Sequence, residues 1–365
     1  MKTYCKGLKI DRAFIEKAYA EWTKAPAGKK NSWRVDEEYG GKDVLIDEIT
    51  EQVESRTLSF KPFKRYKRME KGSRKERDIS IAEVKYQVAT YAVKLAIGGM
   101  LDAKLGYYQT AGVKDKGQKL VKKALAKWSA EEECTHQVKL DVRKCYKHIT
   151  CELVMRILLK FVASEDVLYV AECLLSCYEF GVLEIGTYFS LLMANLVLSY
   201  AYHFIEGLHK YRRGKRRRLV LHQVWHLDDV VLVGSDKRDL KMAVRELTRY
   251  MKERLGLELK PWKVASVDGI EMLDMGGYRA VDGRVTLRKR LFLSVKRAFG
   301  KFSKHKTLAL ARRCCSYWGW LKHSDSGEFV KNNGIAGLLK AAKKMISRHS
   351  KRKEETCAGF AVQPS

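Results

Sequence analysis

The chain has 365 residues, 46% hydrophobic and 32% charged, so it is long and apolar enough for two or three globular domains and is not disordered. Lys and Arg number 72 against 43 Asp and Glu; the formal net charge of +29 indicates a polyanionic partner, nucleic acid first and an acidic membrane second. Nine Cys without a C-x-x-C pair argue against a disulfide framework or a zinc module, and the N-terminus lacks an apolar signal core, so we expect a reduced, cytoplasmic protein.

The first 81 residues contain helical patterns followed by a strongly basic segment. Residues 11–24 and 43–56 have the apolar spacing of amphipathic helices, and we expect a loop over 25–42 between them. Basic and aromatic residues are interleaved over 59–81 around a Lys-Gly-Ser turn at 71–73, which predicts a basic β-hairpin. Such a hairpin could hold a triphosphate or a template backbone, and a solvated surface hairpin is the alternative.

The middle of the chain alternates predicted helices with one short strand. The helices are expected at residues 82–101, 117–128, 150–161, 165–179 and 187–208. Val138, Leu140 and Val142 recur at every second position and predict a strand. Asp141 lies at the end of that strand. Thr150 is suited to cap the helix that follows, because its hydroxyl can accept a backbone hydrogen bond.

The stretch from Ile185 to Phe204 contains no Asp, Glu, Lys or Arg and is long enough to cross a membrane. Ser190, Asn195 and His203 make it a poor membrane span. We therefore predict a helix that is buried under a sheet, and we expect no membrane partner.

Two adjacent carboxylates lie between runs of strand-forming residues in the segment 222–234, which follows an expected basic loop at 210–218. The pattern predicts a β-hairpin with Asp228 and Asp229 at its tip. Burying two like charges side by side is unfavourable unless a cation lies between them, and paired carboxylates suit Mg²⁺. An Asp-Asp turn without a metal is the alternative. His222 and His226 would lie on one face of a strand about 13 Å apart, too far to share an ion.

The remaining chain is predicted to be helical and basic after a short β-region. We expect a helix at 237–254, a turn and strand at 255–263, a hairpin within 276–287, helices from 291 onward and a loose polar tail from about 351. Trp318 and Trp320 are predicted core residues, with a stacking platform as the alternative. A basic helix near 333–348 could face nucleic acid, solvent or a membrane surface.

Six segments, taken in order, resemble the motifs of reverse transcriptases. They are RKERDIS (74–80), KLDVRKCYKHI (139–149), GVLEIGTYFSLLMANL (181–196), HLDD (226–229), LGLELKPWK (255–263) and GGYR (276–279). They are similar to the basic fingers motif, the first palm carboxylate, the glycine loop and helix, the paired carboxylates, the lysine segment and the primer-grip turn. The resemblance covers about residues 59–325.

The resemblance implies a right-hand polymerase of the α+β class. It places N-terminal helices and fingers at 1–135, a palm with an antiparallel sheet backed by helices at 136–288, a helical thumb at 289–350 and a loose tail at 351–365. Part of the fingers would be inserted in the palm.

The resemblance also implies two-metal nucleotidyl transfer by two Mg²⁺ ions, for which Mn²⁺ could substitute. The implied metal set is Asp141, Val142, Asp228 and Asp229. Lys263 would donate a proton to pyrophosphate, and the nearby Lys260 is the alternative. The implied nucleotide-binding set is Lys75, Arg77, Val142, Tyr146 and Gly186, with Arg77 and Lys75 on the triphosphate and Tyr146 as a steric gate against a 2′-hydroxyl.

The implied partners are template RNA, a DNA or RNA primer, deoxynucleoside triphosphates and an accessory RNA-binding protein. Ile185-Gly186 is similar to the corresponding pair in diversity-generating retroelement enzymes. A defence-associated, abortive-infection-like reverse transcriptase and a maturase-like RNA-binding protein without activity are the alternatives.

Overall fold

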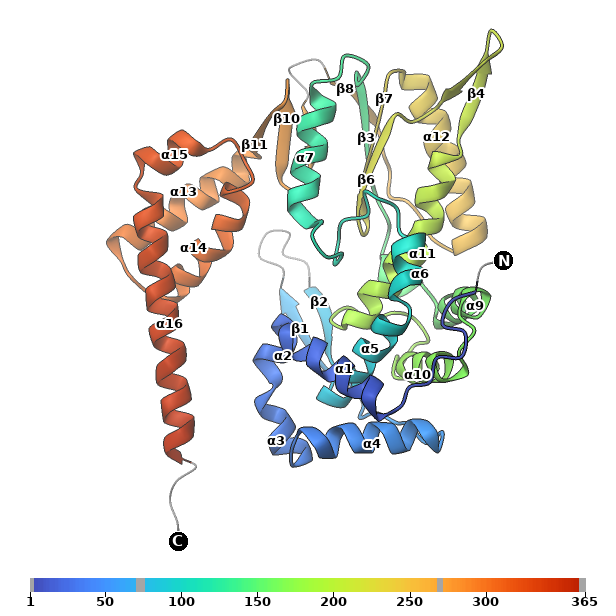
Figure 1. Cartoon of the computed structure of the whole chain (residues 1–365). Helices are drawn as coiled ribbons and strands as arrows, with labels where there is room; N and C mark the ends of the chain where they lie inside the picture. The colour runs from blue at the N-terminus through green and yellow to red at the C-terminus, as the bar shows by residue number, and fades with distance from the viewer. Residues whose placement is uncertain (1–2, 70–75, 268–271, 361–365) are drawn as a thin grey trace. The chain divides into compact units, whose positions relative to one another are not determined.

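The computed structural model describes residues 3–69, 76–267 and 272–360, and of residues 351–360 the backbone alone (Figure 1). It combines helices with small antiparallel sheets, which confirms the α+β class. The chain divides into two compact units, which are described separately. Unit 1 comprises Met1–Gly112, Leu140–Leu219 and Lys241–Trp262, and unit 2 comprises Val113–Lys139, Val220–Leu240 and Lys263–Ser365.

Unit 1 is mainly helical. Its helices are α1 (Arg12–Lys24), α2 (Pro26–Asn31), α3 (Trp33–Tyr39), α4 (Lys42–Glu54), α5 (Val84–Ala96), α6 (Gly98–Lys104), α8 (Cys145–His148), α9 (Cys151–Phe161), α10 (Glu165–Ser176) and α11 (Tyr188–Glu206). Helix α12 (Lys237–Tyr250) begins in unit 2, and its residues from Lys241 onward belong to unit 1. It continues as the π-helical turn η1 (Met251–Leu255). Thr150 caps α9 as predicted, because its hydroxyl accepts from Leu153 N at 3.1 Å.

Two predictions for this unit were wrong at glycine and proline positions. Residues 25–42 are not a loop but contain α2 and α3, since Pro26 occupies the first turn of α2 and Gly40 ends α3 at φ +76°. The single helix expected over 82–101 is two helices, α5 and α6, which meet at Ile97 just before two glycines.

The apolar helix α11 is the only helix among the described residues with the length and hydropathy of a membrane span. It is 72% buried inside the chain over that apolar window, and it contacts α5, α6, α8 and α9. Asn195 is buried but paired, since its side chain donates to Ala111 O at 2.8 Å. Burial against neighbouring helices accounts for its lack of charge.

Unit 1 carries two β-hairpins. The first, β1 (Lys64–Met69) and β2 (Glu76–Ile81), is the predicted basic hairpin, although its turn at 71–73 and Lys75 lie outside the described residues. The second, β4 (His209–Arg212) and β5 (Lys215–Arg218), replaces the basic loop expected at 210–218, so that prediction was wrong.

Unit 2 contains the principal sheet, in the order β6–β7–β3–β8. Its strands are β6 (His222–His226), β7 (Asp229–Gly234), β3 (His136–Asp141) and β8 (Val264–Ser266). The last two residues of β3, Leu140 and Asp141, belong to unit 1. A second sheet is formed by β9 (Leu273–Met275), β10 (Tyr278–Val281) and β11 (Arg284–Leu287), and α7 (Gly117–Ser129) packs on both sheets.

The C-terminal part of unit 2 consists of helices, as predicted. They are α13 (Lys289–Lys304), α14 (Leu308–Leu321), α15 (Gly327–Asn332) and α16 (Ile335–Phe360). The segment expected to be loose from about 351 is therefore helical up to Phe360. Trp320 lies against Gly277 and Tyr278, with 5.4 Å between the two ring centroids, so this tryptophan packs within unit 2.

Candidate active site

Asp228 and Asp229 lie where the sequence predicted them, at the turn of the β6–β7 hairpin. The register pairs His226 with Asp229, so the turn consists of Leu227 and Asp228. Leu227 has φ +56°, a left-handed conformation that is strained for a bulky side chain by about 1–3 kcal/mol. Burial lowers the pKa of His226, and the Asp228 carboxylate opposes this with a smaller effect. The lowered pKa favours the neutral imidazole at physiological pH.

Asp141 ends β3 and lies against a lysine. Lys260 Nζ is 2.6 Å from its Oδ1 and 2.7 Å from its Oδ2, and the backbone N–H of Lys260 donates to Asp141 O at 2.9 Å. In the described part of the chain, Oδ1 is buried and has no aligned hydrogen bond despite that short contact. A buried carboxylate oxygen that is held only by a cation fits a residue suited to bind a metal ion.

The lysine that contacts Asp141 is not the one singled out from the sequence. Val142 forms a β-bridge with Leu259, which places Lys260 directly beside Asp141. Lys263 is exposed and immediately precedes β8.

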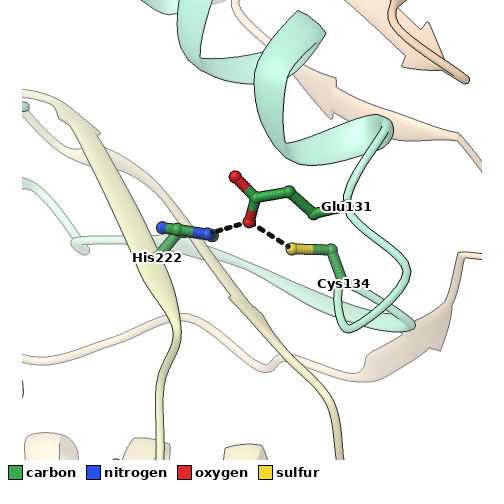
Figure 2. A group of neighbouring side chains, drawn as sticks. All are labelled: Glu131, Cys134 and His222. Atoms are coloured by element: carbon green, nitrogen blue, oxygen red, sulfur yellow. Dashed lines mark hydrogen bonds and ion pairs between the residues drawn. The ribbon is translucent and has the colours of Figure 1, made fainter.

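A second group of ligand-type side chains lies in unit 2 (Figure 2). Glu131, Cys134 and His222 offer donor atoms within 4.8 Å of one another. The Glu131 carboxylate is 2.5 Å from His222 Nε2 and accepts from Cys134 Sγ at 3.5 Å, and the His222 ring stacks on Trp128. Burial, with the nearby Glu131 charge, raises the pKa of the Cys134 thiol to about 12.

Glu131 connects the other two side chains of this group through hydrogen bonds. Cys, His and Glu are ligands that Zn²⁺ accepts, but here Glu131 already accepts hydrogen bonds from both neighbours. Both hydrogen bonds end on the same oxygen of Glu131, so they hold the three side chains together in this arrangement. No sequence pattern marked it, since Glu131 and His222 are 91 positions apart.

The nucleotide-binding candidates of unit 1 lie on two elements that are tied together. Tyr146 is half-buried in α8, and Arg77 lies on β2 opposite Arg68. Lys147, next to Tyr146, forms an ion pair of 3.2 Å with Asp78, next to Arg77. This ion pair therefore links the segment that carries Tyr146 to the strand that carries Arg77.

The backbone at Gly186 lies very close to the backbone of strand β2. Ser80 N donates to Ile185 O at 2.8 Å, and a Cβ on Gly186 would lie 2.2 Å from Ser80 O. Gly186 has φ +124°, which L side chains rarely adopt. Only glycine fits here, so the loop 181–186 docks on β2 because of this residue.

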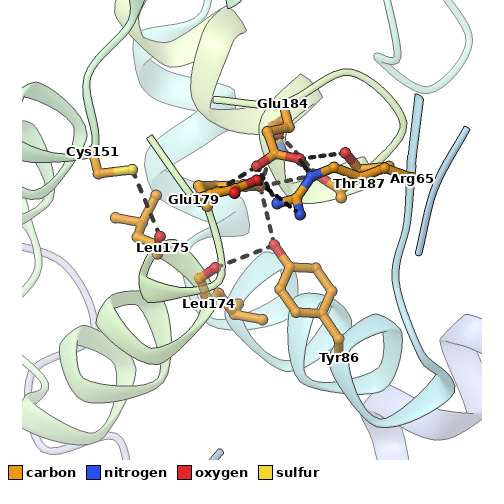
Figure 3. A network of polar contacts seen from close by, with 11 residues as sticks. Arg65, Tyr86, Cys151, Leu174, Leu175, Glu179, Glu184 and Thr187 are labelled. Carbon is orange, nitrogen blue, oxygen red and sulfur yellow. Dashed lines mark hydrogen bonds and ion pairs between the residues drawn. The ribbon is translucent and has the colours of Figure 1, made fainter. Parts of the chain in front are cut away.

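Glu184 strengthens the same junction (Figure 3). Its carboxylate accepts two hydrogen bonds from Arg65 on β1, at 2.8 and 3.1 Å, and a short one from Ser80 on β2. Four side-chain hydroxyls near this junction form a hydrogen-bonded network, with oxygen–oxygen distances of 2.8 to 3.0 Å. They belong to Tyr86, Tyr178, Thr187 and Ser190. The hairpin is thus fastened to the glycine loop by charge and by hydrogen bonds.

Replacing Glu184 by Gln is expected to destabilise the protein at neutral pH and much less in acid. Burial opposes ionisation of Glu184, but hydrogen bonds from Arg65, Ser80 and the Glu179 N–H outweigh it and lower the pKa. A lowered folded-state pKa contributes stability that is present above the ordinary pKa of 4.5 and is lost as pH falls through the folded value.

Urea denaturation near pH 7 and near pH 3 measures this effect, because the contribution declines only below the ordinary pKa of 4.5. The exposed Glu179, which also pairs with Arg65 at 3.0 Å, gives the control Glu179→Gln, for which we expect little change at either pH. Equal destabilisation by Glu184→Gln at both pH values would show that the Glu184 charge is not what holds the loop.

Comparisons with known proteins identify the family. No curated protein matches this chain. Among solved structures, an apo telomerase from Candida tropicalis, truncated from its C-terminal domain, is similar with a TM-score of 0.42 and 10% identity over 63% of this chain. The present chain covers 55% of that telomerase chain.

A family model described as reverse transcriptase (RNA-dependent DNA polymerase) matches residues 69–280, which is more than half of the chain and contains all six motif segments. The chain therefore belongs to the reverse transcriptase family.

Proposed function

We propose that this protein is an RNA-directed DNA polymerase that adds deoxynucleotides to the 3′-hydroxyl of a primer. The observation that carries the proposal is the pair of acidic strand ends in the principal sheet of a reverse transcriptase family member. Asp141 is the last residue of β3, and Asp229 is the first residue of β7, its neighbour in the sheet order. In the proposed organisation, fingers occupy 1–135, the palm 136–288 and the thumb 289–350.

Asp141, Asp228, Asp229 and Val142 are the residues that would hold two Mg²⁺ ions, with Mn²⁺ as a substitute. Bound ions of this kind activate an attacking hydroxyl and neutralise the charge of a leaving pyrophosphate. The buried, poorly hydrogen-bonded Oδ1 of Asp141 supports this role. The Lys260 ammonium group forms an ion pair with Asp141. Lys263 is the proposed proton donor to pyrophosphate.

The incoming nucleotide would be held by unit 1. Arg77, with Lys75, would bind triphosphate oxygens, because a guanidinium can contact phosphate through two parallel hydrogen bonds. Val142, Tyr146 and Gly186 would line the sugar and base. The Lys147–Asp78 ion pair supports a common location for Tyr146 and Arg77.

Shortening Tyr146 to Ala is expected to admit ribonucleotides, because the ring that would meet a 2′-hydroxyl is removed. Discrimination through such a contact is worth about 1–3 kcal/mol, so the preference for deoxynucleotides should fall by about 5- to 150-fold. Single-nucleotide incorporation with matched dNTP and rNTP measures the ratio. Tyr146→Phe keeps the ring and should keep the preference. An unchanged ratio in Tyr146→Ala would exclude the gate.

Primer extension on poly(rA)/oligo(dT) with Mg²⁺ tests the main proposal. Incorporation that requires both the RNA template and the divalent ion is the expected result. If the protein binds RNA but extends no primer with Mg²⁺ or Mn²⁺ on any template, a maturase-like binding function would replace the polymerase function.

We further propose that the enzyme serves a retroelement of the diversity-generating type. The resemblance of Ile185-Gly186 to the corresponding pair in those enzymes supports this choice over a defence-associated enzyme. The partners would be the template RNA, a DNA or RNA primer, deoxynucleoside triphosphates and an accessory RNA-binding protein. Sequencing the products made on a defined template tests the type: errors concentrated at template adenines support it, and synthesis without a template favours the defence role.

A further inference from the structure

The hairpin β4–β5 is an exposed arm that none of the proposed catalytic roles uses. Its two strands pair from His209 with Arg218 to Arg212 with Lys215. The turn residues Arg213 and Gly214 both have positive φ, 49° and 73°, as a tight two-residue hairpin turn requires. Figure 1 shows the arm extending away from the end of α11.

The arm carries an unbalanced positive charge. Residues 210–218 include seven Lys or Arg and no Asp or Glu. Arg212 lies directly opposite Lys215 in the register, and like charges at that position destabilise a hairpin. Within the described ranges, no carboxylate lies within 4.0 Å of the following cations: Arg212, Arg213, Lys215, Arg217 and Arg218. A two-stranded ribbon is marginally stable by itself, so this charge favours an anionic partner that offsets the repulsion.

One aromatic side chain distinguishes the arm from a simple charged surface. Tyr211 is 77% exposed, so its ring has little protein to pack against. It pairs with Arg216 across the hairpin, and residues that pair directly share one face of a sheet. An exposed ring beside a guanidinium group on a cationic ribbon is suited to stack on an unpaired base while the cations contact phosphates.

We propose that the β4–β5 arm binds RNA, with its cations on the phosphates and Tyr211 stacked on an unpaired base. The choice of RNA rests on the proposed function, because an RNA-copying enzyme holds a partly single-stranded RNA. A membrane surface fits less well, since membrane-bound segments bury an apolar face and this arm has none. Duplex DNA fits less well, since its paired bases offer nothing for Tyr211 to stack on.

Binding of the full-length protein to a labelled RNA stem-loop tests the proposal, without nucleotides and with EDTA, so that polymerase activity does not enter. The fully paired stem and a DNA duplex of equal length are the comparison ligands. The triple variant Arg216→Gln/Arg217→Gln/Arg218→Gln should weaken stem-loop binding and lower the slope of log K against log salt by about two, since each single-strand phosphate contact contributes about 0.7.

The matched control neutralises three exposed lysines of the same unit, Lys17→Gln/Lys29→Gln/Lys30→Gln. It should leave the salt slope nearly unchanged. A second arm variant, Arg212→Gln/Lys215→Gln, removes a like-charge pair, so it should weaken RNA binding without lowering the melting temperature. Together these variants separate a loss of binding from a loss of folding.

Tyr211→Ala tests the stacking part of the proposal. It should weaken binding to the stem-loop by at least about fivefold and leave binding to the paired stem unchanged, because only the loop offers an unpaired base. Tyr211→Phe keeps a stacking ring and should bind as tightly as the natural protein.

Three outcomes would overturn the proposal. The first is an equal effect of the triple variant and its lysine control, which means non-specific charge. The second is an equal loss of DNA-duplex and RNA binding together with no effect of Tyr211→Ala. The third is arm-dependent binding to phosphatidylserine vesicles with unchanged RNA binding. Arm-dependent RNA binding in a protein that extends no primer would instead overturn the polymerase function and leave this inference standing.

Discussion

Replacing Asp228 by Asn is expected to remove nearly all primer extension without unfolding the protein. Asp228 occupies the two-residue turn of the β6–β7 hairpin, where Asn has nearly the same shape and the same tolerance for turn conformations. The substitution removes the negative charge that we propose to hold a metal ion. Loss of such a ligand should lower the rate of nucleotide addition by at least about 1000-fold, which corresponds to about 4 kcal/mol.

Single-turnover incorporation on a preformed RNA–primer complex measures this rate, and a thermal melt confirms folding. The control is Asp282→Asn in the turn of the β10–β11 hairpin of the same unit, where Asp282 has φ +46° and Asn is well tolerated. Both substitutions remove one acidic charge from a hairpin turn, but only Asp228→Asn should lose activity. If Asp228→Asn extends primers at the natural rate, the Asp-Asp turn is only a turn.

The two acidic strand ends could be predicted from the sequence because their signal is local. Alternating apolar residues around Asp141, and apolar runs on both sides of Asp228, predict strands whatever the rest of the chain does. The β6–β7 hairpin and β3 are found at these places. No strand was predicted for the segment 210–218, because it has almost no apolar residues that could alternate with polar ones. Its hairpin depends on a turn in which Arg213 adopts a positive φ.

Features that depend on distant pairing could not be predicted. LGLELKPWK contains two lysines, and nothing in that segment indicates which of them reaches Asp141. The bridge between Val142 and Leu259 decides in favour of Lys260. Gly186 stays a predicted nucleotide-binding residue, and the structure adds that a Cβ at this position would meet Ser80 O of β2. A sequence pattern indicates that glycine is needed but not which atoms come near it.

Replacing Gly186 by Ala is expected to be among the most destabilising single changes in unit 1. The new Cβ would lie 2.2 Å from Ser80 O and 3.0 Å from Ser80 N, both of them backbone atoms of β2. The loop or the strand must therefore shift, which breaks the 2.8 Å hydrogen bond from Ser80 N to Ile185 O. Backbone strain of about 1–3 kcal/mol and a lost hydrogen bond of about 1 kcal/mol give a total of about 2–4 kcal/mol.

Gly181→Ala is the matched control, because Gly181 begins the same loop at φ +60° and no atom lies within 4 Å of its added Cβ. It should lower the free energy of unfolding by only about 1 kcal/mol, the cost of a left-handed alanine. Urea denaturation of both variants separates conformational strain from the clash with β2. If Gly186→Ala unfolds no more easily than Gly181→Ala but raises the KM for dNTP, the glycine is needed for a ligand rather than for β2. If it is unstable, as we expect, then the strand that carries Arg77 is held in place by a position where no other side chain fits.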